Sequence, residues 1–291
     1  MLFDQIAANK RYTVYFIILF YLLLCTVGAA LGLYQWNNIL LGLVFSSTIG
    51  LSYILLMLMT ATRVVMWMNG ASEVTDKESS TVLFDLVDEV AIAAGIPKPR
   101  IFIIEDTAMN AFATGTSPDN AAIAVTRGLL NNLERYELEG VVAHEIAHIR
   151  NYDIRLATIS VALVAAIGFL SRISMAGRRD RKRSDSNGSA SWLMLIAFIA
   201  MLAAPFIATL LRFALSRNRE YLADATAIDI TRNPDGLIRA LEKIQRTPGA
   251  LSVHDTFSKA LWFSSPDEKE KAGWFDSHPP LSLRIARLKE M

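Results

Sequence analysis

The chain has 291 residues, of which 53% are hydrophobic, and its formal net charge is +1. A balance this close to neutral gives no reason to expect a nucleic-acid partner. The single cysteine, Cys25, excludes an intrachain disulfide framework and a cysteine-rich zinc site, so any metal must be held by histidine and carboxylate side chains.

Two apolar runs near the amino terminus are long enough to cross a membrane. Thr13–Leu33 and Ile39–Ala61 contain no charged residue, and a bilayer core needs about 20 apolar helical residues. The connector 34–38 is short, polar and aromatic, as expected for a turn at a membrane interface. We therefore interpret residues 1–62 as a transmembrane hairpin.

Residues 63–155 change to a pattern that is typical of a small α+β domain. Apolar residues at helical spacing predict a helix over 79–94, which Gly95 and Pro97 end. A β-rich run, a hairpin around a turn signal and a long helix follow, and we expect them over residues 100–104, 110–126 and 133–152. This segment is interpreted as the first part of the catalytic domain.

Residues 156–215 predict a second hydrophobic hairpin. Its first run, 156–170, is short for a membrane span, and its second run, 192–211, contains Pro205, which should kink it. A basic segment, 178–183, lies between the two runs. The last part, 216–291, returns to helical patterns at 217–230, 236–245 and 282–289, and it is interpreted as the second part of the catalytic domain.

The motif His144-Glu145-Ile146-Ala147-His148 carries the chemistry. Side chains four residues apart stand on one face of a helix, so the two imidazoles can meet one Zn²⁺ ion. Zinc lowers the pKa of a water molecule, and Glu145 can take its proton as the water attacks a peptide carbonyl. A chance match on an amphipathic helix is the alternative, but two of the chain's four histidines make up this motif.

A catalytic zinc ion needs a third protein ligand, and Glu220 is the candidate. Asp224 follows it by one helical turn and could accept a hydrogen bond from a ligand imidazole, which would fix the tautomer of that ring. A solvated helix face with ordinary ion pairs is the alternative interpretation of this pair.

Several motifs, in this order along the chain, resemble the HtpX family of bacterial membrane proteases and, more distantly, the CAAX prenyl endopeptidases. They are the segment 110–115, the His144–His148 motif followed by Asn151 and Asp153, the Glu220–Asp224 pair, and Ser277–Leu281 followed by Arg284. The resemblance covers nearly the whole chain. It implies an α+β fold, with a zincin-like metalloprotease domain, a small β-sheet, about four hydrophobic helices as a membrane anchor, and one Zn²⁺ per chain.

The resemblance also implies roles for the site residues. His144, His148 and Glu220 would be zinc ligands, Glu145 would be the general base, and Asp224 would accept a hydrogen bond from a ligand. Asn110 would bind the substrate backbone. His278 would stabilise the oxyanion of the tetrahedral intermediate, although a histidine capping the turn before Pro279 is the alternative, and Arg284 would support that site and the substrate.

Zinc peptidases usually bind their substrate as a strand added to an exposed sheet edge. Ala121–Val125 is the candidate edge strand, and an ordinary core strand is the alternative; the sequence does not separate the two.

Membrane topology presents a conflict. His144 and Glu220 must meet, so the chain between them crosses the bilayer an even number of times. Basic residues near the first hairpin favour a cytoplasmic active site, as the resemblance does, but a spanning second hairpin places the basic segment 178–183 outside. Three explanations are open. The second hairpin does not cross the membrane, or the basic loop lies outside despite its charge, or the whole protein has the inverted orientation in the membrane. Four spans in the bacterial cell membrane are our working interpretation.

The resemblance implies degradation of damaged or misfolded membrane proteins, so we expect unfolded polypeptides and the lipid bilayer as partners. Two other functions agree less well with the sequence. A membrane scaffold with a structural zinc site would not need Glu145, and a transporter would need more ionisable residues in its apolar runs. We further expect the basic segment to bind anionic lipid or to gate substrate entry, and self-cleavage within 178–190. The sequence does not indicate an oligomeric state.

Overall fold

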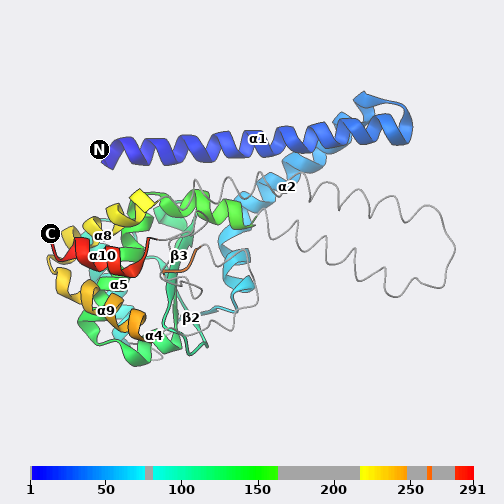
Figure 1. Ribbon diagram of the computed structural model, residues 1–291. Coiled ribbons are helices and arrows are strands. Elements are labelled where there is room, and N and C mark those ends of the chain that lie inside the picture. Colours follow the sequence, from blue (N-terminus) through cyan, green and yellow to red (C-terminus); the bar gives the residue numbers. More distant parts are fainter. Residues whose placement is uncertain (1, 76–80, 163–216, 248–260, 264–278) are drawn as a thin grey trace.

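The computed structural model describes residues 2–75, 81–162, 217–247, 261–263 and 279–291 (Figure 1). The expectations for His278, for the basic segment 178–183 with its predicted self-cleavage, and for the run 192–211 lie outside the described residues. The elements are α1 (Leu2–Trp36), α2 (Ile39–Met68), β1 (Ser72–Glu73), α3 (Thr81–Ala94), β2 (Arg100–Ile104), β3 (Ala111–Gly115), a 3-10 turn (Pro118–Asn120), β4 (Ala121–Thr126), α4 (Arg127–Asn132), α5 (Arg135–Arg150), α8 (Arg217–Thr231), α9 (Pro234–Arg246) and α10 (Leu281–Leu288).

The helices α1 and α2 form the hairpin that the sequence predicts. Its turn is shorter than the expected connector, because Asn37 adopts a left-handed φ of 48° and the side chain of Asn38 accepts a hydrogen bond from the amide of Leu41. The two helices pack closely where glycines face each other, as at Gly32 and Gly42. Close backbone approach at small residues is typical of helix pairs in membranes.

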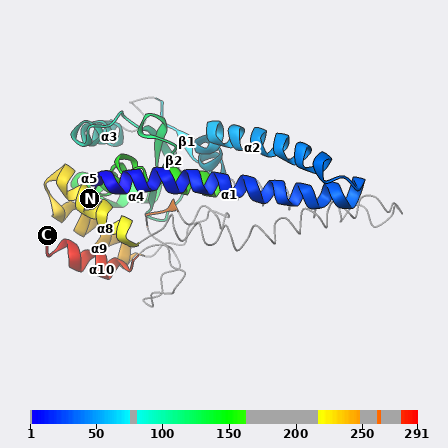
Figure 2. The same cartoon turned by 90° about the horizontal axis from the view of Figure 1, so that it is seen from above.

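Both helices of this hairpin are long and apolar enough to cross a membrane. Only 28% and 17% of their most hydrophobic windows are buried within the structure, so they are not core helices of the domain. Large side chains such as Leu40, Ile49 and Met59 are exposed on them. Figures 1 and 2 show the turn of the hairpin projecting away from the domain, whereas the amino-terminal turns of α1 lie over it.

The sheet has four strands in the order β1-β2-β4-β3. Strand β2 pairs in parallel with β4, and β3 pairs antiparallel with β4 on its other side. The expectation that Ala121–Val125 forms the exposed edge is therefore wrong, because these residues belong to β4, which lies inside the sheet. The edge strands are β1 and β3, and β3 is the first strand of the predicted hairpin. All six residues of β4 are buried, as expected for a strand covered on both faces.

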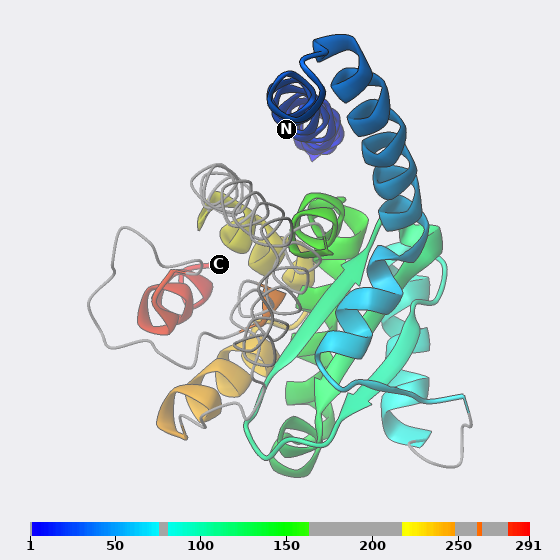
Figure 3. The same cartoon turned by 90° about the vertical axis from the view of Figure 1, so that its right-hand side faces the viewer.

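Alternate strand residues face the two sides of the sheet, and Figure 3 shows the last turns of α2 lying across one of these sides. One face packs against α3, α5 and α9 and forms the larger core, in which Ile101, Ile123 and Val125 contribute from the strands. The other face carries Phe102 and Phe112 and is covered by the last turns of α2 and by Val161 and Trp262. The membrane hairpin thus runs directly into the packing of the sheet.

The helix α5 is shorter than the predicted helix 133–152. Its N-cap is Glu134, which forms a capping box with Glu137, and a separate short helix, α4, precedes it. It ends at Arg150, and Tyr152 takes a left-handed φ of 60° before the chain turns into helix again over 153–162. Leu156 and Ile159, at the start of the predicted third apolar run, are buried in a cluster with residues of α1 and α2.

Candidate metal centre

The helix α5 holds His144 and His148 one turn apart, with their Nε2 atoms 3.1 Å from each other. The outer nitrogen of each ring faces a carboxylate: Nδ1 of His144 lies 2.9 Å from Asp224 Oδ1, and Nδ1 of His148 lies 3.1 Å from Asp153 Oδ2. An ionised carboxylate only accepts hydrogen bonds, so each Nδ1 carries the proton. Both Nε2 lone pairs are therefore free to bind a cation between the rings.

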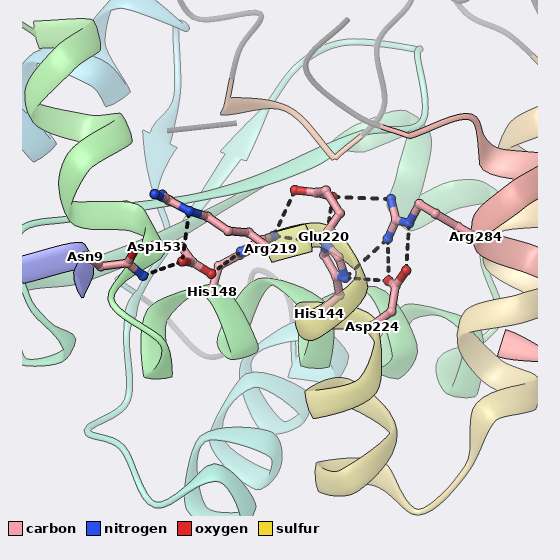
Figure 4. Close-up of polar contacts among 8 residues, drawn as sticks. All are labelled: Asn9, His144, His148, Asp153, Arg219, Glu220, Asp224 and Arg284. Atoms are coloured by element: carbon pink, nitrogen blue, oxygen red, sulfur yellow. Dashed lines mark hydrogen bonds and ion pairs between the residues drawn. The ribbon is translucent and has the colours of Figure 1, made fainter. Parts of the chain in front are cut away.

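Glu220 brings its carboxylate to the same point from α8 (Figure 4). Its Oε2 lies 3.6 Å from His144 Nε2, and its Oε1 lies 3.5 Å from His148 Nε2. Among the described residues, these three form a cluster that could hold a metal ion, with donor atoms within 4.8 Å of one another.

The distances fit a single zinc ion. Ligand atoms about 2.0–2.1 Å from a tetrahedral zinc stand roughly 3.3 Å apart. Here the two Nε2 atoms are separated by 3.1 Å, and the two oxygens of Glu220 lie 3.5 and 3.6 Å from the nearer Nε2 atom. Two imidazoles and one carboxylate are also a common ligand set of catalytic zinc sites, in which the fourth position stays open for water or substrate. The residues present therefore fit the metal that the sequence predicts.

Arg284 lies behind this cluster and is fully buried. Its guanidinium donates to both oxygens of Asp224, and its Nη1 lies 3.7 Å from Glu220 Oε2. Burial alone would raise the pKa of Asp224, but Arg284 and His144 outweigh it and lower that pKa to about 2. In the structure Arg284 is thus an internal partner of Asp224, and its role toward substrate stays a prediction.

Glu145 lies on α5 next to His144 and is buried against the edge strand. Burial raises the pKa of its carboxyl, against the opposing effect of the two histidines, and the backbone amide of Ala113 in β3 is a hydrogen-bond partner. The outward side of β3 also meets other groups, since Gly115 donates its amide to Thr158 and Ala111 accepts from the amide of Phe263. The edge of the sheet therefore borders the candidate base directly.

An aromatic side chain closes one side of the cluster. The ring of Phe263 lies edge-to-face against His144, with centroids 5.0 Å apart, and the guanidinium of Arg284 stands 4.8 Å from its centroid. Its neighbour Trp262 packs against Phe112 on the other side of the sheet. These contacts exclude water from the back of His144, which strengthens the nearby electrostatic interactions.

The remaining expected site residues are placed differently. Asn110 is buried at the start of β3, where its side-chain oxygen accepts from the amide of Ala111, and its role toward substrate stays a prediction. Sequence reasoning gave no role to Asp153, which faces His148, or to Phe263, whose ring packs on His144. No local sequence pattern gives a signal for either contact.

Comparison with known proteins decides the family. The model described as Peptidase family M48 matches residues 78–291. The chain belongs to peptidase family M48. The match includes the His-Glu-x-x-His helix α5 and the helices α8 and α10, which supply Glu220, Asp224 and Arg284. The membership shows that the chain is a metallopeptidase, and the three-residue cluster supplies a site for its metal ion.

Full-length relatives agree with this membership. A protein named "Protease HtpX homolog" from Listeria monocytogenes serotype 4a is 54% identical over 304 residues, with 100% of both chains covered. A protein of the same name from Leuconostoc citreum is 46% identical over 298 residues, again with 100% of both chains covered. The resemblance to the HtpX family is thereby confirmed, and it includes the amino-terminal hairpin. A crystal structure of S. mikatae Ste24p aligns with a TM-score of 0.49 and 20% identity, over 98% of this chain and 66% of that one.

Proposed function

We propose that this metallopeptidase is a zinc-dependent endopeptidase of the bacterial cell membrane, with His144, His148 and Glu220 as zinc ligands. One observation carries the proposal. The two inner imidazole nitrogens lie 3.1 Å apart, and each lies 3.5–3.6 Å from one oxygen of the Glu220 carboxylate. Both outer imidazole nitrogens are held by carboxylates, so that the inner ones face a common point. When zinc is bound there, it supplies a Lewis acid and lowers the pKa of water.

Glu145 is the general base in this proposal. Its carboxylate takes the proton of the attacking water and returns it to the leaving amine. The hydrogen bond from Ala113 and the packing around α5 support this role, since they fix the Glu145 carboxylate next to His144 on the ligand helix without making it a ligand. Asp224 holds the proton of His144 on Nδ1, and Arg284 keeps Asp224 ionised in a buried position. His278 completes the oxyanion site in this proposal, as the resemblance implies.

The substrate lies extended along β3. This strand is the outer strand of the sheet beside Glu145, and a peptide can pair with an edge strand. Phe263, Glu145 and Thr158 bond outward backbone groups of β3, so a bound peptide has to replace some of these contacts. Asn110 directly precedes that strand, and in this proposal it aligns the substrate backbone, as the resemblance implies. The substrate class that we propose is damaged or misfolded membrane protein, cut where its polypeptide reaches the cytoplasmic face.

The basic residues at the domain end of the membrane hairpin support a cytoplasmic active site. Lys10 and Arg11 precede the apolar part of α1, and Arg63 follows that of α2, whereas the turn Asn37–Asn38 at the other end carries no charge. A cysteine at position 38 or 139, in a Cys25→Ser background, tests this orientation. An impermeant maleimide should label the first in intact cells and the second only in opened cells. Labelling in the reverse order would contradict the proposal.

The zinc site is tested on the full-length protein, purified in detergent. We expect about one zinc per chain by metal analysis, and casein cleavage that stops on chelation and returns with zinc but not with magnesium. Glu220→Gln should lose the zinc, and Glu139→Gln, a half-exposed glutamate of α5 outside the cluster, should keep it. Cleavage by metal-stripped protein, or wild-type protein without zinc affinity, would contradict the proposal.

A further inference from the structure

The helix α1 is longer than a membrane span requires. Its 35 residues correspond to about 52 Å of helix, whereas the hydrocarbon core of a bilayer is about 30 Å thick. The amino-terminal turns, before the uncharged run that starts at Thr13, lie over the domain in both Figure 1 and Figure 2. The amino-terminal turns of α1 are therefore not needed to cross the membrane and serve another function.

Asn9, on these turns, reaches the segment that follows the ligand helix. Its side chain is buried, and Nδ2 donates to Asp153 Oδ1 at 2.7 Å and to the backbone carbonyl of Asn151 at 3.1 Å. The neighbouring Lys10 places its ammonium 4.1 Å from the ring centroid of Tyr152. Three consecutive residues of the turn after α5 are thus in contact with α1, and the middle one has a left-handed backbone that needs such support.

The contact continues to the metal cluster. Asp153 uses Oδ1 for Asn9 and Oδ2 for Nδ1 of His148, so one carboxylate joins the membrane helix to the imidazole (Figure 4). Arg219 approaches the same carboxylate with its Nε at 3.9 Å from Oδ1, which is beyond hydrogen-bond distance. Asn9 is therefore the residue whose hydrogen bond sets the rotation of the Asp153 carboxylate from the α1 side.

The two imidazoles are supported in parallel ways from opposite directions. His144 meets Asp224, which Arg284 of α10 holds; His148 meets Asp153, which Asn9 of α1 holds. In each case an N–H donor orients a buried carboxylate, and the carboxylate orients a ring. Such outer partners fix the direction of the ligand lone pair and change metal affinity when they are removed.

We propose that Asn9 is a positioning residue of the metal site, acting through Asp153 on His148. The amino-terminal helix is then part of the catalytic machinery as well as an anchor. The inference rests on the proposed function, since it takes His148 as a zinc ligand. It concerns only the orientation of that ligand, so an effect on zinc is expected even where substrate binding is unchanged.

The test uses two Asn9 variants of the full-length protein. Asn9→Leu removes the amide at similar volume, and Asn9→Asp keeps the shape but replaces the donor with a carboxylate facing Asp153. Zinc affinity is measured by competition with a chelator, and kcat and KM are measured on casein. Both variants should bind zinc about tenfold or more weakly, with a lower kcat and an unchanged KM. Thr13→Val, one turn further along α1, is the control, because its buried hydroxyl donates only to the backbone of Asn9.

A double-mutant cycle separates positioning from general helix docking. If Asn9 acts through Asp153, then Asn9→Leu combined with Asp153→Asn should weaken zinc binding no more than Asp153→Asn alone. Additive losses would overturn the proposal, as would wild-type zinc affinity in both Asn9 variants while His148→Ala has lost the metal. A wild-type protein that binds no zinc would overturn the proposed function itself, and this inference with it.

Discussion

Arg284 and Asp224 form a bidentate ion pair, in which Nε donates to Oδ2 at 2.9 Å and Nη2 donates to Oδ1 at 2.6 Å. The pair joins α10 to α8 directly behind His144. Both side chains are buried, so each charge depends on the other for its solvation.

Arg284→Leu should therefore destabilise the domain strongly. The substitution leaves the Asp224 carboxylate buried without its main partner, and breaking a buried pair in this way costs about 3–5 kcal/mol. Arg284→Lys should recover only part of the loss, because an ammonium does not present two parallel donors. Thermal unfolding of the metal-free protein in detergent measures both effects.

Lys289→Leu is the control for that experiment. Lys289 lies on the same short carboxyl-terminal segment and pairs with Glu242 at the surface, so its loss should hardly move the transition. Equal transitions for wild type and Arg284→Leu would show that the buried pair does not hold α10 in place.

The packing of α5 on α9 depends on Gly140. A Cβ at this position would lie 2.5 Å from the backbone nitrogen of Leu237 and 2.7 Å from its Cα, so the helices would have to move apart. Gly140→Ala should lower the free energy of unfolding by about 1–3 kcal/mol, despite the better helix propensity of alanine. Chemical denaturation compares it with Glu139→Ala, the half-exposed neighbour, for which a similar loss would contradict the packing argument.

The membrane hairpin should respond unequally to two alanine substitutions in α2. A Cβ at Gly42 would lie 2.2 Å from the carbonyl oxygen of Gly28, which is backbone, whereas one at Gly50 would first meet the flexible end of Leu24 at 3.2 Å. Gly42→Ala should therefore make the protein more sensitive to unfolding by sodium dodecyl sulfate, and Gly50→Ala should change it little. The reverse order of sensitivity would show that α1 and α2 pack elsewhere.

The sequence predicts local features of this site well because they depend on spacing. The distance of four residues between His144 and His148 is enough to place both rings on one helix face, whatever surrounds them. The pair Glu220 and Asp224 is likewise local, and only its meeting with α5 needs the fold. The structure supplies that meeting through α8, which packs along α5.

Features that depend on distant packing were not predictable in the same way. Asn9 and Asp153 come from parts of the chain that share no periodicity, so nothing in the sequence connects them. The place of Ala121–Val125 in the sheet also depends on distant packing. The segment is uniformly apolar up to Val125, and all of β4 is buried because the strand is covered on both faces. The pairing of β4 with both β2 and β3 decides between the two interpretations, which the sequence left open.

The central claim is that Glu145 is the general base of a zinc peptidase. The substitution Glu145→Gln tests it most directly when zinc content and cleavage are measured on the same preparation. The amide keeps the shape of the side chain but cannot take a proton from water. We predict that wild type, Glu145→Gln and the control Glu139→Gln all bind about one zinc per chain, and that only Glu145→Gln loses cleavage of casein, by a factor of about 10² or more. Cleavage by Glu145→Gln at the wild-type rate, with zinc bound, would contradict the assignment of Glu145 as the base and with it the mechanism proposed for this site.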